Sequence, residues 1–198
     1  MKSTIFGKAA IYSLLLASLS VVQAAEISQD DKFTANLSGY LGQKSLDDND
    51  WGTQDGQDAS GVTFDFKRQS RPVSIVGGLV ARGDVEENGA LKTEAYTIEN
   101  RIGVRKYFES ETSSFSPYIG GGLALVLAGI RNKNGDVITS KNDDDATGAW
   151  VGAGLNYAVS DHFIVGFDVT YTEAEVTLFN VDRKAGGMHS GITAGYHW

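Results

Sequence analysis

The chain has 198 residues and carries 17 basic against 25 acidic side chains, which gives a formal net charge of −8 at pH 7. This acidic balance argues against a nucleic-acid partner, because binding to phosphate groups requires a basic face. The chain has no cysteine, so disulfides, thiol catalysis and cysteine-based metal sites are excluded.

The first 24 residues have the pattern of a secretory signal peptide. Two lysines precede an apolar core over residues 9–22, and the Val-Gln-Ala tripeptide at 22–24 suits cleavage after Ala24. The apolar stretch is short for a spanning helix, so a retained anchor is the less favoured alternative. We predict a signal peptide over residues 1–24 and a single domain over residues 25–198.

Eight later stretches alternate apolar residues with polar or small ones. Successive side chains of a strand point to opposite faces, so residues of one parity meet one environment along the whole strand. Spanning strands need about nine to eleven residues, whereas soluble strands average about five or six. The predicted strands cover residues 33–44, 60–67, 73–82, 94–108, 115–130, 147–158, 163–176 and 187–198.

In the fourth predicted strand, Ile98 and Ile102 share the outward face, and Glu99 lies on the inward face. Asn100 and Lys106 are polar exceptions on the outward face. The stem of Lys106 can lie along lipid while its ammonium reaches water. Asn100 has no such reach, so it fits this register less well.

The connections between the predicted strands alternate in length. Short periplasmic turns and long outer loops are typical of bacterial outer-membrane barrels. Long polar segments follow the odd-numbered strands, at 45–59, 83–93, 131–146 and 178–186. Short turns follow the even-numbered strands, at 68–71, 109–114 and 160–162.

Seven of the eight predicted strands carry an outward-parity aromatic residue at the end beside the short turns. Aromatic rings concentrate where lipid meets water, so we predict a membrane interface there. The residues are Phe33, Phe66, Phe108, Phe115, Tyr157, Phe163, Tyr196 and Trp198.

A soluble barrel or sandwich would place the apolar parity inside and the polar parity in water. The strand lengths and the aromatic girdle favour the opposite arrangement. The longest apolar run, residues 120–130, is too short to cross a bilayer as a helix. We therefore expect an all-β fold, an eight-stranded antiparallel up-and-down transmembrane β-barrel.

Three segments carry a family resemblance: Ser-Pro-Tyr-Ile-Gly-Gly-Gly-Leu at 116–123, Ile-Gly-Val-Arg-Lys-Tyr-Phe at 102–108, and Gly-Tyr-His-Trp at 195–198. The chain resembles the small eight-stranded outer-membrane barrels of Gram-negative bacteria, the OmpA/OmpX-like and opacity-type group. The resemblance implies an outer-membrane location and recognition of the last strand by the barrel-assembly machinery. Trp198 stands where the family usually has Phe, and Thr193 where it often has Gly.

Charged residues occupy the inward parity. An eight-stranded barrel has an interior just wide enough for side chains to fill it, and buried charges must be paired. We predict a polar network that plugs the bore, with a proton pathway or small-ion leak as the alternative. Its members are Lys44, Asp65, Lys67, Glu99, Arg101, Arg105, Asp168 and His189, with Arg82 and His197 also inward.

Two features could carry other chemistry. The His189-Ser190 pair is similar to the serine and histidine of lipid A deacylase barrels, but adjacent residues point to opposite sides unless a bulge intervenes. Two acidic clusters, Asp47-Asp48-Asn49-Asp50 with Asp55 and Asp58, and Asp143-Asp144-Asp145, offer oxygen ligands for Ca²⁺ or Mg²⁺, but their spacing does not match a complete EF-hand loop. We predict solvated acidic loops, no catalytic residue, no metal and no cofactor.

Inward glycines such as Gly120, Gly152 and Gly154 leave one side of the bore without bulk. If Tyr118 and Trp150 do not fill that space, a narrow pocket for an acyl chain remains. Glycine also lets curved strands approach closely, which is the simpler explanation.

These patterns predict a protein of the cell outer membrane that is not an enzyme. Its expected role is structural or interactive: membrane integrity, lipopolysaccharide contact, or adhesion through extracellular loops. The alternatives are a barrel that binds or modifies lipid or a small hydrophobic ligand, and a narrow channel. The expected partners are outer-membrane lipid, lipopolysaccharide and the barrel-assembly machinery. A monomer is expected because a closed barrel satisfies its own backbone hydrogen bonds.

Overall fold

The computed structural model describes residues 32–46, 56–110, 112–135 and 137–198. The predicted signal peptide, residues 1–24, and the acidic residues at 47–50 lie outside the described part. Among the described residues, none forms a helix long and apolar enough to cross a membrane.

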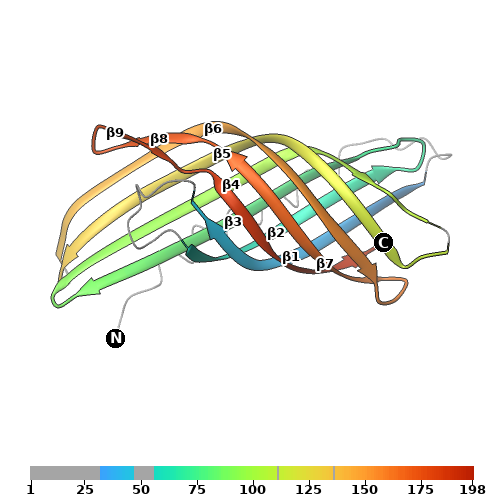
Figure 1. Ribbon diagram of the computed structural model, residues 1–198, viewed down its shortest axis with the longest axis horizontal. Helices are drawn as coiled ribbons and strands as arrows, with labels where there is room; N and C mark the ends of the chain where they lie inside the picture. The colour runs from blue at the N-terminus through green and yellow to red at the C-terminus, as the bar shows by residue number, and fades with distance from the viewer. Residues whose placement is uncertain (1–31, 47–55, 111, 136) are drawn as a thin grey trace. The chain divides into compact units, whose positions relative to one another are not determined.

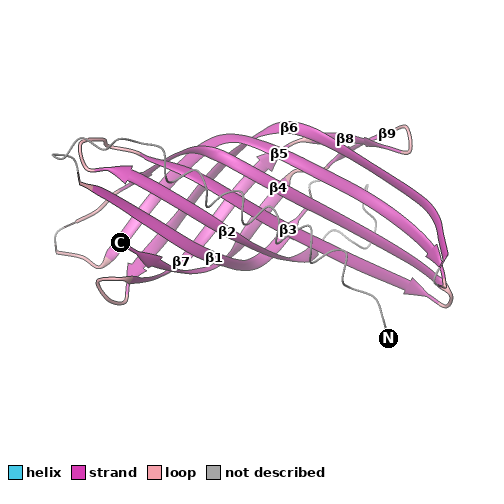
Figure 2. Ribbon diagram, turned by 180° about the vertical axis from the view of Figure 1, so that it is seen from behind, coloured by secondary structure: helices cyan, strands magenta, loops and turns pink. Residues whose placement is uncertain are grey.

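The described chain is built from β-strands (Figures 1 and 2). Eight of them form a closed barrel in the order β1-β10-β7-β6-β5-β4-β3-β2, and β8 and β9 form a separate two-stranded sheet. The strands are β1 Phe33–Ser45, β2 Gly56–Arg68, β3 Ser74–Asn88, β4 Leu91–Tyr107, β5 Phe115–Asn134, β6 Val137–Ala158, β7 Phe163–Glu173, β8 Glu175–Leu178, β9 Val181–Lys184 and β10 Gly187–His197.

Pairing of the first strand with the last closes the barrel. β1 and β10 are antiparallel from Asn36 opposite His197 to Ser45 opposite Met188. Closure gives every strand two neighbours and leaves no unpaired edge along the ring. The predicted eight-stranded antiparallel barrel is confirmed.

The predicted parity is also confirmed. Outward residues are exposed on the barrel surface, including Leu41 at 64%, Ile102 at 62% and Leu123 at 60%. Inward Tyr118 and Trp150 are each 3% exposed. An apolar outer wall around a buried polar interior is the arrangement of a barrel whose solvent is lipid.

Two of the predicted long loops are strands. β3 and β4 continue as a hairpin through 83–93 and turn at Gly89, which has a φ of 64°. β5 and β6 continue through 131–146 and turn beside Gly135, with a φ of 58°. The loop prediction was wrong here because a backbone ladder does not require apolar side chains once the strands leave the lipid.

The seventh predicted strand ends earlier than expected. β7 stops at Glu173, and the β8–β9 hairpin forms from the end of the predicted strand 163–176 and from most of the predicted loop 178–186. Its turn residues Phe179 and Asn180 have φ values of 53° and 61°, the left-handed pair of a two-residue type I′ turn. The hairpin lies along β6 (Figure 1).

Candidate functional site

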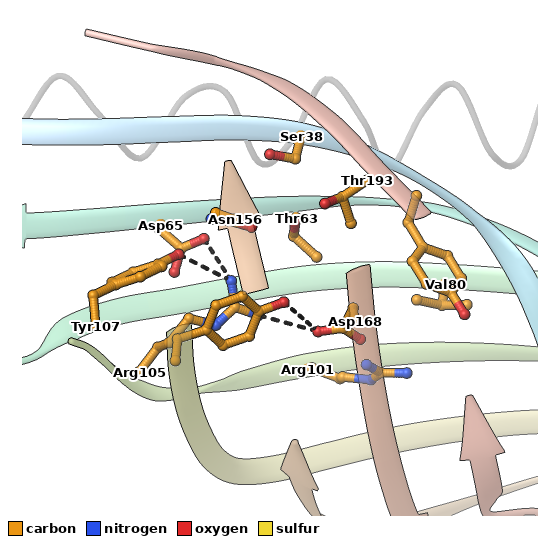
Figure 3. Close-up of a pocket in the computed structure, with 12 residues that line it drawn as sticks. Ser38, Thr63, Asp65, Val80, Arg101, Arg105, Tyr107, Asn156, Asp168 and Thr193 are labelled. Atoms are coloured by element: carbon orange, nitrogen blue, oxygen red, sulfur yellow. Dashed lines mark hydrogen bonds and ion pairs between the residues drawn. The ribbon is translucent and has the colours of Figure 1, made fainter. Parts of the chain in front are cut away.

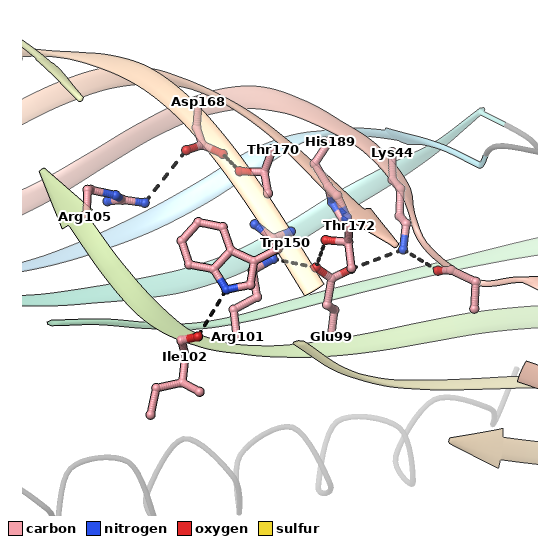
Figure 4. A network of polar contacts seen from close by, with 11 residues as sticks. Lys44, Glu99, Arg101, Ile102, Arg105, Trp150, Asp168, Thr170, Thr172 and His189 are labelled. Atoms are coloured by element: carbon pink, nitrogen blue, oxygen red, sulfur yellow. Dashed lines mark hydrogen bonds and ion pairs between the residues drawn. The ribbon is translucent and has the colours of Figure 1, made fainter. Parts of the chain in front are cut away.

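Glu99 is the centre of a buried cluster in the outer half of the bore (Figure 4). Its carboxylate accepts hydrogen bonds from Lys44 Nζ at 3.3 Å, Arg101 Nε at 2.5 Å and Thr172 Oγ1 at 2.5 Å. His189 Nε2 lies 3.0 Å from the same carboxylate. Four side chains from different parts of the ring therefore meet at one acid.

Asp168 and Arg105 form a second cluster nearer the short turns (Figure 3). Arg105 Nη1 donates to Asp65 at 2.9 Å, and its Nη2 lies 3.9 Å from Asp168. Asp168 also accepts from Tyr118 Oη at 2.7 Å and Thr170 Oγ1 at 2.9 Å. The Arg105 guanidinium stacks 4.2 Å from the centre of the Tyr118 ring, a cation–π contact.

The excess cation of the outer cluster balances the excess acid of the inner cluster. The outer cluster pairs Lys44 and Arg101 with Glu99, and the inner cluster pairs Arg105 with Asp65 and Asp168. None of these side chains is more than 9% exposed. Ions buried this deeply are tolerated only with close partners, and each of these ions has one inside the bore.

Little space remains between the clusters. The cavity there measures about 20 Å³ and is lined by Tyr40, Arg101 and Tyr118 among others. A single water molecule needs about 10–15 Å³ by this measure. The cavity is therefore too small for an acyl chain.

Large side chains fill the space left by the inward glycines. A Cβ added at Gly103 would lie 2.8 Å from Trp150 Cζ2, and one at Gly120 would lie 3.3 Å from its Cη2. A Cβ at Gly154 would collide with the Tyr118 ring. The glycines thus make room for bulky residues from neighbouring strands rather than for a ligand.

The three other predicted inward residues are Lys67, Arg82 and His197. Lys67 donates a hydrogen bond to Glu109 at 2.9 Å near the short turns, so its ion pair lies at the rim of the barrel and not within the two clusters. Arg82 is buried at 5% exposure. His197 Nδ1 lies 2.6 Å from Asn36 Oδ1.

Most of the predicted girdle residues contact another aromatic ring, either across neighbouring strands or, for Tyr196 and Trp198, two residues apart along the chain. Phe108 has no aromatic partner among the described rings, but Lys106 Nζ lies 5.6 Å from its centre. The ring-centre distances are 4.9 Å for Phe33–Phe66, 4.9 Å for Phe115–Tyr157, 5.5 Å for Phe163–Tyr196 and 5.9 Å for Tyr196–Trp198.

The β8–β9 hairpin packs against the inner side of the β5–β6 hairpin. Val176 and Leu178 are 1% and 0% exposed and belong to one apolar cluster with Val126 and Ala128. The backbone N–H of Thr177 donates to Asp144 at 2.7 Å. Sequence reasoning missed this docking, because Asp144 was assigned to a solvated loop.

The base of the hairpin is tied to the bore. Lys44 Nζ donates to the carbonyl of Ala185 at 2.8 Å, in addition to its contact with Glu99. Lys44 is 1% exposed and Ala185 is 0% exposed. The hairpin and the outer cluster are therefore one connected structure.

Ion pairs cover the outer face of the β3–β4 and β5–β6 hairpins. Their N–O distances are 2.9 Å for Lys92–Glu87, 2.6 Å for Lys133–Glu94 and 2.6 Å for Lys141–Asp143. In the described part of the chain, no three His, Cys, Asp or Glu residues lie close enough to hold a metal ion.

Acidic side chains outnumber basic ones on the three hairpins. They are Asp84, Glu86, Glu87, Glu94, Asp143, Asp144, Asp145, Glu175 and Asp182, against Lys92, Arg131, Lys133, Lys141, Arg183 and Lys184.

His189 and Ser190 lie on opposite faces of β10. His189 is 1% exposed and contacts Glu99 inside the bore, while Ser190 belongs to the outward parity opposite Gln43. No register shift separates the two residues in the pairing with β1. They therefore do not form one site.

Residues 13–198 match the family described as "Outer membrane protein beta-barrel domain". The chain belongs to this family. Its location is the cell outer membrane. In bacterial outer-membrane barrels the short turns face the periplasm and the long connections lie outside.

Several known proteins are similar to the chain. Outer membrane protein PagN of Salmonella typhimurium is 23% identical over 211 residues, covering 97% of this chain and 86% of PagN. The crystal structure of Ail, the attachment invasion locus protein of Yersinia pestis, in complex with the heparin analogue sucrose octasulfate has a TM-score of 0.59 at 13% identity. That match covers 84% of this chain and 99% of Ail.

Neisserial surface protein A has a TM-score of 0.54 at 16% identity, covering 85% of this chain and 98% of that protein. At these identities the structural matches establish a shared fold.

Proposed function

We propose that this barrel is a non-enzymatic surface protein that binds a partner through its three extracellular hairpins. In this account the bore is a structural core. The observation that carries the proposal is the contrast between a filled interior and strands that continue as ordered hairpins beyond the apolar wall.

In the part of the chain that the structure describes, the cavity between the two clusters is too small for an acyl chain. Two ion-pair clusters occupy the bore, and the cavity between them is about 20 Å³. This favours a surface role over the two alternatives, a narrow channel and a barrel that binds a hydrophobic ligand.

The hairpins have the order expected of a binding surface. The β8–β9 hairpin is docked on the β5–β6 hairpin through Leu178 and the Thr177–Asp144 hydrogen bond. Preorganised elements lose less conformational entropy on binding than mobile loops do. Exposed apolar side chains lie near the turns of the two longer hairpins, with Leu91 at 59% and Val137 at 67% exposure.

The charge of the hairpins favours a basic or apolar protein partner. Ail, whose structure contains a sulfated saccharide analogue, supports a role in surface attachment for this fold. The acid excess on the hairpins of the present chain would repel such a polyanion. We therefore infer a partner whose surface carries basic residues.

A second proposed contact is with lipopolysaccharide in the outer leaflet. Leu127 faces lipid on β5, and Arg131 continues the same parity above it, opposite Lys141 of β6. Basic side chains at that height suit lipid phosphates. Assembly by the barrel-assembly machinery and a monomeric state belong to the same proposal.

Adhesion of cells that display the protein tests this function. In the test variant, residues 84–95 are replaced by an Asn-Gly turn, which removes the β3–β4 hairpin and keeps the barrel. The full chain should bind host cells or immobilised basic proteins, and the variant should lose most of that binding. Surface display and heat-dependent gel migration control for folding. Equal adhesion by both proteins would contradict the proposal.

A further inference from the structure

Basic residues gather on one sector of the periplasmic rim, where β2, β3 and β4 meet the short turns. We propose that Arg68, Arg71 and Lys106 in this sector bind the headgroup of an anionic phospholipid in the periplasmic leaflet. The site is independent of the extracellular surface proposed above.

The strand register brings these cations together. Ser74, the first residue of β3, pairs with Lys67 on one side and Arg105 on the other. Arg68 and Lys106 are the next residues along β2 and β4, so they flank the start of β3. Their backbones are about 10 Å apart, two strand spacings.

Arg71 lies in the turn that joins β2 to β3. Its backbone N–H donates to the carbonyl of Arg68 at 2.8 Å, which closes the turn. Arg71 and Lys106 are exposed. The three cations thus surround one point of the rim.

Two of the cations are held at the level of the aromatic girdle. The Arg68 guanidinium lies 5.6 Å from the Phe33 ring centre, and the Lys106 ammonium lies 5.6 Å from that of Phe108. Both side chains have outward parity. A cation above an aromatic ring at the lipid boundary keeps its charge at headgroup height.

The local charge balance favours an anion. Glu109, which follows this sector, is bonded to Lys67 at 2.9 Å. The turn at 159–162, on the opposite part of the rim, contains Asp161 and neither Lys nor Arg. Among the described residues of the rim, basic side chains therefore gather beside β2, β3 and β4.

The surroundings identify the occupant as a lipid. Phe66, Ile75 and Val104 form the outward wall directly beneath the cations, so a ligand here must combine apolar tails with an anionic head. Each basic residue near a membrane surface strengthens attachment of anionic lipid about fivefold.

Native mass spectrometry of the full chain released from nanodiscs tests this site. The discs contain equal amounts of phosphatidylcholine and phosphatidylglycerol. The test variant is Arg68→Gln/Arg71→Gln/Lys106→Gln, and the control Lys92→Gln/Lys133→Gln/Lys184→Gln removes the same charge from the extracellular hairpins. Folding is checked by heat-dependent gel migration.

The wild type and the control should retain phosphatidylglycerol in preference to phosphatidylcholine. In the test variant the ratio of retained phosphatidylglycerol to retained phosphatidylcholine should be at least about fivefold lower. Unchanged preference in the test variant, or an equal loss in the control, would overturn the proposal. Complete displacement of lipid by inorganic phosphate at matched ionic strength would also overturn it, because the site would then recognise phosphate alone.

If the triple variant does not fold, Arg71→Gln provides the test, since this residue lies in an exposed turn. It should reduce the preference, and an Arg71→Lys variant should restore it. Equal retention by Arg71→Gln and the wild type would count against the site.

Discussion

Lys44 and Glu99 form an ion pair across the bore, with 3.3 Å between Nζ and Oε2 and 1% exposure for each side chain. They come from β1 and β4, which are separated in the ring by β2 and β3. The pair therefore connects strands that share no backbone hydrogen bond.

Glu99→Gln should lower the free energy of unfolding by about 3–5 kcal/mol, because it leaves Lys44 and Arg101 buried without their acid. Urea titration of the protein folded in lipid vesicles measures this change. Glu87→Gln breaks the exposed pair with Lys92 and should change the free energy of unfolding far less, because water screens this pair. Equal losses in the two variants would show that the outer cluster does not stabilise the barrel.

Gly154→Ala should destabilise the barrel by about 1–3 kcal/mol through overpacking. The added Cβ would collide with Tyr118 and lie 2.5 Å from the carbonyl oxygen of Phe167. Gly77→Ala is the matched control, since its Cβ meets nothing closer than 3.9 Å. The same urea titration distinguishes them, and a neutral Gly154→Ala would mean that the bore has spare space.

Leu178→Ala should release the β8–β9 hairpin, because Leu178 is 0% exposed in its apolar contact with β5 and β6. A buried Leu→Ala change costs about 2–5 kcal/mol. Cleavage by chymotrypsin after Phe179 should become faster, while Val181→Ala, at a residue 50% exposed, should leave the rate unchanged. If both variants are cleaved at the wild-type rate, the hairpin is not held by this contact.

The pKa of Asp143 lies below its ordinary value of 3.8. Partial burial raises this pKa, but the hydrogen bonds from Lys141 and Tyr96 lower it by more than burial raises it. A depressed carboxyl pKa adds stability above pH 3.8 that is lost as the pH falls through the folded-state value. The gain is small, below about 1 kcal/mol, because the pair is accessible to water. Carboxyl NMR titration of the wild type should give a midpoint below 3.8 for Asp143. The Lys141→Gln variant should have a higher midpoint for Asp143. A midpoint at or above 3.8 in the wild type would contradict the geometry.

Side-chain parity was sufficient to predict the barrel wall. Alternation along each strand placed Leu41 and Ile102 outside and Tyr118 and Trp150 inside, as the structure has them. It worked because lipid and bore are chemically different on the two faces. The extracellular hairpins could not be predicted this way, since both faces of 83–93 meet water.

The sequence also could not predict which inward residues contact each other inside the bore. Parity placed Glu99 and His189 inward, but it does not say which inward residues share a height. That depends on the stagger between strands, which is a property of the closed ring. Thr172 was missed as a partner of the outer cluster for the same reason, whereas Ala185 was missed because its backbone carbonyl lies in the predicted loop 178–186.

Single-channel recording in planar bilayers tests most directly whether the bore is a core and the hairpins carry the function. The refolded full chain should insert and give no reproducible unit conductance, because charged pairs and aromatic rings fill its interior. Discrete, reproducible steps that change size in Glu99→Gln would contradict the account and place the activity inside the barrel.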